Sequence, residues 1–200
     1  MGRSGDPTKK GILDSLRELL KDRPLDSITP TDIAHQAGIA RQTFYYHFDS
    51  VQDVFFWAIG RHIEYSISPY NAHSALTPTL RCYVRICDAL KAYEDLTRVF
   101  ARDRPKALYD YIHSLMEPHI TSDMGKMLDD IVSPEVIRSL TIMQTRGYVG
   151  TIERWIGTGM ESNPIETIQT VFDSYPAILS ANAIERVRAM SREHQEKDRF

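Results

Sequence analysis

The chain has 200 residues, of which 42% are hydrophobic and 26% are charged, and its formal net charge is −3. This composition belongs to a globular protein with a sizeable core and excludes a disordered chain. No apolar run approaches the ~18 residues that a membrane-spanning helix needs, and residues 1–6 lack an apolar signal segment. The only cysteines, Cys82 and Cys87, fit a reducing compartment better than a disulfide scaffold, so we expect a cytoplasmic protein.

Residues 8–21 are predicted to form the first helix, because their aliphatic side chains recur at helical spacing. These side chains are Ile12, Leu13, Leu16, Leu19 and Leu20. Asp22-Arg23-Pro24 then ends the helix.

A two-turn helix over residues 30–37 has both of its ends marked in the sequence. Thr29 is a good N-cap, Pro30 suits the first helical position, and Asp32 completes a capping box. Gly38 supplies the left-handed residue that stops the helix.

A second short helix is predicted over residues 41–47. At ~100° per residue, its polar and aromatic side chains fall on one arc of roughly 140°, whereas Phe44 and Phe48 can bury against the preceding helix. The residues on the arc are Arg41, Gln42, Tyr45 and Tyr46. Arginine suits guanine and glutamine suits adenine, so the pair of helices is interpreted as a helix-turn-helix whose recognition helix reads DNA.

Ser50 and Asp53 predict a capping box that opens a helix at 51–66 with apolar side chains on two of its sides. The remaining sequence predicts further helices and no strand. Their expected positions are 78–93, 95–102, 105–120, 122–131, 134–156, a segment opened by Asn163-Pro164, and 177–190 after a break at Pro176. The fold class is therefore all-α, with about nine or ten helices.

Residues 8–66 resemble the DNA-binding domain of the TetR/AcrR family of bacterial transcriptional regulators. The resemblance is carried by Ile33-Ala34, by Ala37-Gly38-Ile39-Ala40 and by Thr43-Phe44-Tyr45-Tyr46-His47-Phe48. It implies a DNA-binding domain with a connecting fourth helix at 1–66, and an effector-binding and dimerisation domain at 67–200.

The expected DNA-binding residues come from both lines of argument. Arg41, Gln42, Tyr45 and Tyr46 are expected to read bases or line the groove. By position in the family motif, Thr43, Tyr45 and His47 resemble phosphate contacts, and Thr31 faces the same groove. The alternatives are packing for Tyr45 and Tyr46, and a core or capping role for His47.

Two departures from the family pattern, and the net charge of residues 1–66, weaken the DNA-binding interpretation. Ala40 stands where Ser or Thr commonly caps the recognition helix, and Val51 where many members carry a phosphate-binding Lys. Residues 1–66 hold eight Lys and Arg residues against nine Asp and Glu residues, whereas a DNA-binding module is usually basic.

The carboxyl half offers residues for a small-molecule effector pocket, although ordinary helical core is the alternative for each of them. These residues are Tyr83, Tyr109, His113, Met116 and Met124. His113 and His119 do not share a helical face, so we expect no metal. We expect no cofactor either. Gly147 and Gly150 suit close helix approach across a dimer, or else accommodate a neighbour within the chain.

The leading hypothesis is a homodimeric repressor that binds a pseudo-palindromic operator in double-stranded DNA and is released by a small-molecule effector. The alternative is a degenerate family member that binds a ligand or a protein without binding DNA. An enzyme is a third and weaker reading, because we find no Gly-x-Ser-x-Gly, His-Glu-x-x-His or P-loop motif, and we expect no catalytic residues.

Overall fold

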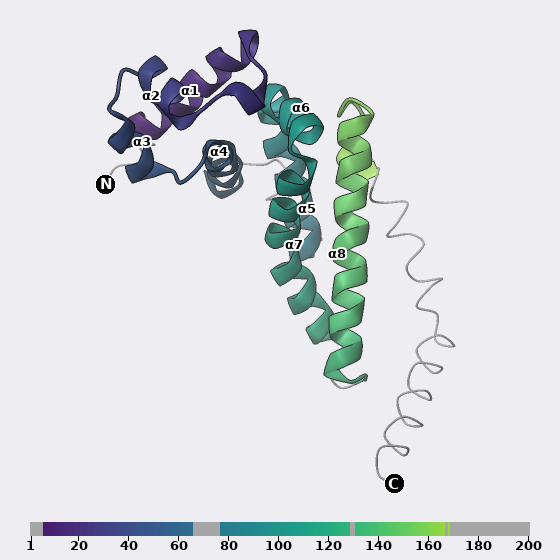
Figure 1. Ribbon diagram of the computed structural model, residues 1–200. Helices are drawn as coiled ribbons and strands as arrows, with labels where there is room; N and C mark the ends of the chain where they lie inside the picture. Colours follow the sequence, from purple (N-terminus) through teal and green to yellow (C-terminus); the bar gives the residue numbers. More distant parts are fainter. Residues whose placement is uncertain (1–5, 66–76, 129–130, 167, 169–200) are drawn as a thin grey trace. The chain divides into compact units, whose positions relative to one another are not determined.

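The structure is a computed structural model that describes residues 6–65, 77–128, 131–166 and 168. Within these ranges every regular element is helical, which confirms the predicted all-α class (Figure 1). The elements are α1 (Pro7–Asp22), the 3-10 turn η1 (Leu25–Ser27), α2 (Pro30–Gln36), α3 (Arg41–His47), α4 (Val51–Tyr65), α5 (Pro78–Ala92), α6 (Glu94–Asp103), α7 (Pro105–Leu128) and α8 (Pro134–Gly157).

The chain divides into two compact units. The first contains residues 1–68 and 88–111, and the second contains residues 69–87 and 112–200. Asn163 accepts a hydrogen bond from the Ile165 N–H at 2.9 Å, as a helix N-cap does. The domain boundary expected between residues 66 and 67 and the helices expected on either side of Pro176 lie outside the described residues.

The first unit is built on a core shared by α1, α2 and α3. Ile12, Leu16, Ile33 and Phe44 are fully buried there. The helical spacing of the apolar residues in α1 gives this helix one apolar stripe, which packs against α2 and α3. The apolar residues of α2 and α3 face this stripe.

Helix α4 buries apolar side chains on two sides, as its sequence pattern predicts. On one side the Trp57 ring packs edge-on against Phe48 with 5.8 Å between ring centroids. On another side Phe55 packs against Phe100 of α6 at 4.6 Å, and Phe56 stacks on Tyr111 of α7 at 4.4 Å. The helix that follows the helix-turn-helix is thereby fixed to α6 and to the start of α7.

The prediction of two separate helices at 105–120 and 122–131 is wrong, because α7 runs unbroken from Pro105 to Leu128 with Pro118 inside it. Every fourth residue along the whole helix is buried, so apolar packing continues through the expected break, and Pro118 itself lies exposed. The buried residues are Leu108, Ile112, Met116, Ile120, Met124 and Leu128. Burial of this stripe outweighs the backbone hydrogen bond that proline cannot make.

The second unit places α5 antiparallel to α7. The Thr79 hydroxyl donates to Asp123 Oδ2 at 2.6 Å, and Cys82 Sγ lies 3.5 Å from the Leu115 carbonyl oxygen. The Tyr83 ring packs against Tyr148 of α8 with 5.8 Å between centroids. Among the described residues, no helix combines the length and the apolar character that crossing a membrane requires.

Candidate nucleic-acid interface

The start of α2 is held by a complete capping box. The Asp32 N–H donates to Thr29 Oγ1 at 3.2 Å, and the Thr29 N–H donates to Asp32 Oδ2 at 2.8 Å. Arg23 adds an ion pair to Asp32 with Nη1 and Oδ1 3.1 Å apart. The Arg23 guanidinium, together with the hydrogen bonds from Thr29, holds the pKa of Asp32 well below its usual range.

The turn between α2 and α3 requires a glycine. Gly38 has a φ of +66°, and the following Ile39 N–H donates to the Ala34 carbonyl at 3.0 Å while the Gly38 N–H donates to the His35 carbonyl at 3.1 Å. These two bonds form a Schellman motif, which fixes the direction in which the chain leaves α2. The predicted stop signal at Gly38 is confirmed.

Helix α3 begins without a side-chain cap, because Ala40 occupies the N-cap position. Phe44 is 0% exposed and Phe48 is also buried, so the apolar edge of this short helix anchors it to the first unit. The predicted bounds of the recognition helix, 41–47, agree with the structure. Packing through Phe44 and Phe48 therefore replaces capping as the main constraint on α3.

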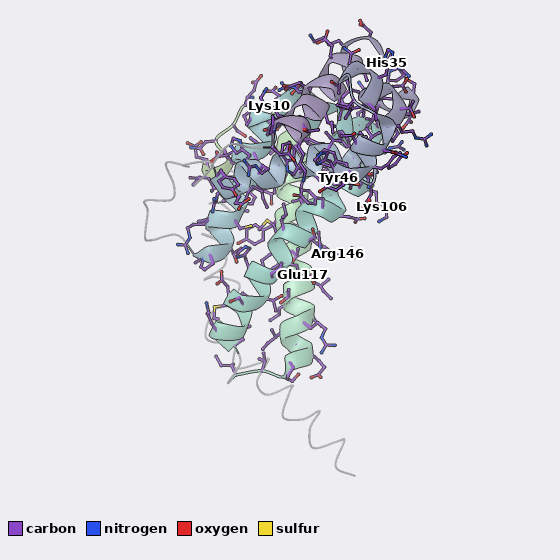
Figure 2. The ribbon with its side chains drawn as sticks, turned by 90° about the vertical axis from the view of Figure 1, so that its left-hand side faces the viewer. Lys10, His35, Tyr46, Lys106, Glu117 and Arg146 are labelled. Atoms are coloured by element: carbon purple, nitrogen blue, oxygen red, sulfur yellow. The ribbon has the colours of Figure 1, made fainter. Side chains whose placement is uncertain are left out.

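The outer face of α3 presents the four side chains that were expected to read DNA. Arg41, Gln42, Tyr45 and Tyr46 are all exposed. Tyr46 is 84% exposed and lies on the surface of the first unit (Figure 2). Tyr45 is 43% exposed, with one ring edge packed 5.6 Å from Phe44, so it divides its surface between the core and solvent.

Arg41 and Tyr45 lie one helical turn apart and orient each other. The Arg41 guanidinium carbon is 5.4 Å from the Tyr45 ring centroid, and its Nη2 lies 3.5 Å from the Tyr45 hydroxyl oxygen. A cation placed near an aromatic ring in this way loses part of its rotamer freedom before any ligand binds. The guanidinium is thus already held beside the exposed face of α3.

The three remaining expected contacts are placed differently from one another. Thr31 of α2 is exposed and Thr43 is half-buried. The His47 side chain is only 13% exposed, and its Nδ1 lies 3.4 Å from Oδ2 of Asp6. Sequence reasoning missed Asp6, because nothing local connects residue 6 with residue 47.

Several acids of the first unit form ion pairs with Lys or Arg residues outside α3. Asp14 pairs with Lys10 and Glu18 with Lys21, both at 2.6 Å, and Asp26 pairs with Arg104 at 2.6 Å. Helix α3 itself contains Arg41 and no acid. The acidic surplus of residues 1–66 is therefore not concentrated on the helix that carries the candidate site.

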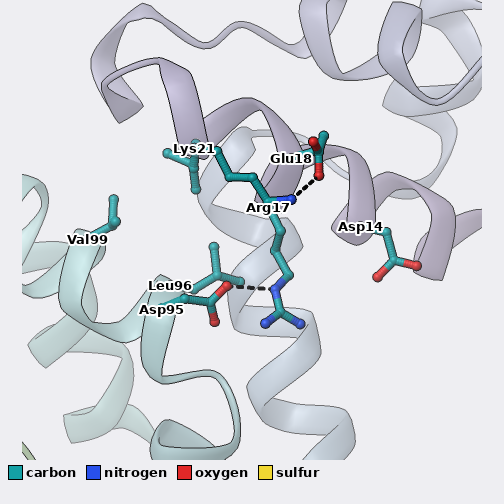
Figure 3. Close-up of a pocket in the computed structure, with 8 residues that line it drawn as sticks. Asp14, Arg17, Glu18, Lys21, Asp95, Leu96 and Val99 are labelled. Atoms are coloured by element: carbon teal, nitrogen blue, oxygen red, sulfur yellow. Dashed lines mark hydrogen bonds and ion pairs between the residues drawn. The ribbon is translucent and has the colours of Figure 1, made fainter.

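One of these charged regions forms a groove of about 500 Å³ between α1 and α6 (Figure 3). Arg17 donates through Nε to Asp95 Oδ2 at 2.7 Å across it, and the Lys21–Glu18 pair lies on the α1 side. Leu96 and Val99 supply the apolar part of the lining. The Arg17–Asp95 pair links α1 to α6 across this groove. None of the expected DNA contacts lines the groove.

The expected effector residues are not all in one unit. Tyr83, Met116 and Met124 are buried in the second unit, whereas Tyr109 belongs to the first and is only half-buried. His113 is partly exposed, with Nδ1 3.7 Å from Glu117 Oε2. The Tyr83 side chain is 0% exposed, and burial raises the pKa of Tyr83.

Helices α2 and α3 form a helix-turn-helix. Its second helix, α3, is anchored by buried phenylalanines and displays Arg, Gln and Tyr side chains. Residues 12–56 match the family described as "Bacterial regulatory proteins, tetR family". Residues 79–175 match the family described as "Transcriptional regulator C-terminal region". The chain belongs to the TetR family of transcriptional regulators.

Relatives whose names are known match a short part of the chain. The "HTH-type transcriptional regulator EthR" of Mycobacterium tuberculosis, strain ATCC 25618 / H37Rv, is 43% identical over 58 residues, which are 29% of this chain and 27% of EthR. EthR of Mycobacterium bovis matches over the same shares. The chain thus matches about a quarter of the length of these relatives.

A solved structure shares the fold over most of the chain. The fatty acid degradation regulator FadR from Bacillus halodurans superposes with a TM-score of 0.52, covering 86% of this chain and 96% of that chain. The two sequences are 15% identical, so the likeness concerns the fold alone.

Proposed function

We propose that this protein is a dimeric transcriptional repressor that binds a pseudo-palindromic operator through α3 and is released by a small-molecule effector. The observation that carries the proposal is the division of α3 into two faces. Phe44 and Phe48 are buried, while Arg41, Gln42 and Tyr46 are exposed. A helix held in this way presents planar hydrogen-bonding groups to a ligand without having to rearrange.

Arg41 and Gln42 stand at the amino-terminal end of α3, where recognition helices contact base edges. A guanidinium donates two hydrogen bonds to guanine, and a glutamine amide both donates to and accepts from adenine. Thr31, Thr43, Tyr45 and His47 offer hydroxyl or imidazole groups to the phosphates. These contacts position the protein, whereas Arg41 and Gln42 carry the sequence preference.

The effector site is proposed for the second unit, around the buried side chains of Tyr83, Met116 and Met124. Ligand pockets are mostly apolar and contain a few polar groups that orient the ligand. The Tyr83 hydroxyl is such a group, since the whole side chain is buried. An effector acts only if it binds the DNA-free state more tightly than the DNA-bound state.

The dimer contact is proposed for the outer face of α8. Ile142 and Met143 are exposed there, and a Cβ built at Gly147 or Gly150 meets nothing within 4 Å. This open space argues against the alternative that the glycines accommodate a neighbour among the described residues. Two copies related by a two-fold axis would place two α3 helices on half-sites about 34 Å apart. We propose that this assembly works in the cytoplasm.

A second candidate function is binding of a ligand or a protein without DNA. Helix α3 lacks a side-chain cap at Ala40, which removes about 1 kcal/mol of local stability relative to Ser or Thr. Val51, where a phosphate-binding Lys would stand in many family members, adds to this argument.

Selection from a pool of random duplex oligonucleotides, followed by band-shift titration at low salt, separates the two functions. The repressor proposal expects enrichment of a pseudo-palindrome and binding in the low-micromolar range or tighter. Absence of any shift at low salt, with protein that is folded and dimeric, would favour the second function.

A further inference from the structure

A single carboxylate joins the beginning of α1 to the end of α3. Asp6 is the N-cap of α1, and its Oδ1 accepts hydrogen bonds from the backbone N–H groups of Thr8 at 3.0 Å and Lys9 at 3.4 Å. Its second oxygen, Oδ2, lies 3.4 Å from Nδ1 of His47, the last residue of α3. The two oxygens of Asp6 therefore serve two different elements.

The His47 ring is held on two sides. Its side chain is 13% exposed, and the Tyr46 ring meets it edge-on with 5.0 Å between centroids and 84° between planes. A carboxylate facing Nδ1 accepts a hydrogen bond only when that nitrogen carries the proton. The other ring nitrogen, Nε2, is then the atom that remains for a further partner.

The position of His47 along α3 indicates what this partner is. Base edges are contacted from the amino-terminal end of a recognition helix, where Arg41 and Gln42 stand. A residue at the opposite end lies beside the sugar–phosphate backbone. In the imidazolium form both ring nitrogens donate, Nδ1 to the carboxylate and Nε2 to a phosphodiester oxygen.

We propose that Asp6 is a positioning residue for DNA binding, which orients His47 so that Nε2–H donates to a backbone phosphate. The inference rests on the proposed function. It adds a residue that no local motif predicts, and it gives the N-cap of α1 a second role. It also predicts an effect of unusual sign, because removing a negative charge from a DNA-binding surface ordinarily strengthens binding.

Asp6→Asn is the decisive variant. Asparagine is as good an N-cap as aspartate, so α1 keeps its start. When its oxygen accepts from the α1 backbone, however, its NH2 group takes the place of Oδ2 beside His47 Nδ1, and this group donates hydrogen bonds and cannot accept them. Asp14→Asn is the matched control, because it removes one negative charge from the same helix at a residue whose partner is Lys10.

The affinity of the full chain for its selected operator, and for an unrelated duplex, is measured by fluorescence anisotropy across a salt series. Asp6→Asn and His47→Phe are each expected to weaken both affinities about tenfold and to reduce the salt slope by about 1. The double variant is expected to lose no more than either single variant. Asp14→Asn is expected to bind at least as tightly as the parent, and thermal unfolding checks that all four variants fold.

The nitrogen-15 spectrum of the imidazole in the DNA-free protein supplies a readout that stability alone does not move. His47 is expected to be protonated at Nδ1 in the parent and to lose this preference in Asp6→Asn. The role of Asp6 is overturned if Asp6→Asn binds DNA as tightly as the parent or more tightly. It is also overturned if the double variant loses the product of the two single losses in affinity. Failure of the parent to bind any duplex overturns the proposed function instead, and this role with it, while the spectrum still reports the pair.

Discussion

The side chains of Thr29 and Asp32 show how much of the candidate interface depends on a few local hydrogen bonds. They bind each other's backbone N–H groups at the start of α2, and Arg23 reaches Asp32 from the end of α1. Because α2 has only seven residues, it would be only marginally stable as an isolated helix. The cap therefore contributes to holding α3 through the turn at Gly38.

Loss of this cap should depend on pH in a defined direction. The pKa of Asp32 is depressed in the folded chain, so its contribution is complete above the unfolded-state pKa near 4 and declines as the pH falls below that value. Asp32→Asn is expected to lower the melting temperature at pH 7 and to differ less from the parent at pH 3. Thermal denaturation followed by circular dichroism at both pH values measures the two differences.

Thr29→Ala is the companion variant, with an expected loss of about 1 kcal/mol at pH 7. A gap between parent and Asp32→Asn that stays constant from pH 7 to pH 3 would contradict the assignment of the depressed pKa to the cap.

Among the elements, α4 and α7 meet at a joint that explains a glycine in the middle of a helix. The Tyr111 hydroxyl donates to the Phe56 carbonyl at 2.9 Å, and a Cβ at Gly60 would lie 3.2 Å from that hydroxyl oxygen. The Tyr111 and Phe56 rings stack with 12° between their planes. Gly60 thus leaves the space in which the hydroxyl sits.

Gly60→Ala and Gly11→Ala should consequently behave differently. Both substitutions raise helix propensity by about 1 kcal/mol, and none of the described atoms lies within 4 Å of the Cβ position at Gly11. We expect Gly11→Ala to stabilise the protein and Gly60→Ala to be neutral or destabilising, because Tyr111 is held by its hydrogen bond and its stacked ring. Denaturant titration gives the free energies of unfolding.

Tyr111→Phe tests the cause, since it removes the oxygen atom that the new methyl group would meet. In the Tyr111→Phe background, Gly60→Ala is expected to recover the stabilisation seen for Gly11→Ala. Equal gains from Gly11→Ala and Gly60→Ala in the parent would show that the joint is looser than the distances indicate.

Helix α7 is continuous although it contains a proline. Pro118 lies exposed inside this helix, so Pro118→Ala should restore one backbone hydrogen bond without disturbing the buried stripe. We expect a gain of about 1–2 kcal/mol in the free energy of unfolding. An unchanged or lower stability in the same denaturant titration would indicate that the helix ends near residue 118.

Sequence reasoning succeeded where the information is local. The cap at Thr29, the stop at Gly38 and the split faces of α3 depend on residues within a few positions of one another. It divided α7 after residue 120, because the buried stripe that continues through this point depends on packing partners that a local pattern does not reveal. Two of the contacts join positions that are distant in the sequence, namely Asp6 with His47 and Tyr111 with Gly60. No pattern in a single sequence predicts such pairs.

In the whole molecule, the proposed operator binding uses two copies of α3, so dimerisation and DNA affinity should fall together. Gly150→Leu adds a large side chain to the outer face of α8, where no described atom lies within 4 Å of the Cβ position. We expect it to shift the protein to monomer in light scattering and to weaken operator binding at least tenfold. Gly125→Leu on α7, where space is equally open, is the control and should stay dimeric.

A monomeric Gly150→Leu protein with parent-like operator affinity would separate the two properties and contradict a two-fold arrangement of half-sites. A dimer that survives the substitution would place the contact elsewhere on the molecule.

We infer that α3 presents sequence-reading side chains to solvent and is anchored by its buried phenylalanines. The most direct measurement is the binding of Arg41→Ala to the selected operator and to operators changed at each base pair of the half-site. We predict a loss of about 1–3 kcal/mol that is confined to one guanine position, where the variant no longer distinguishes bases. Unchanged discrimination at every position of the half-site would contradict the account.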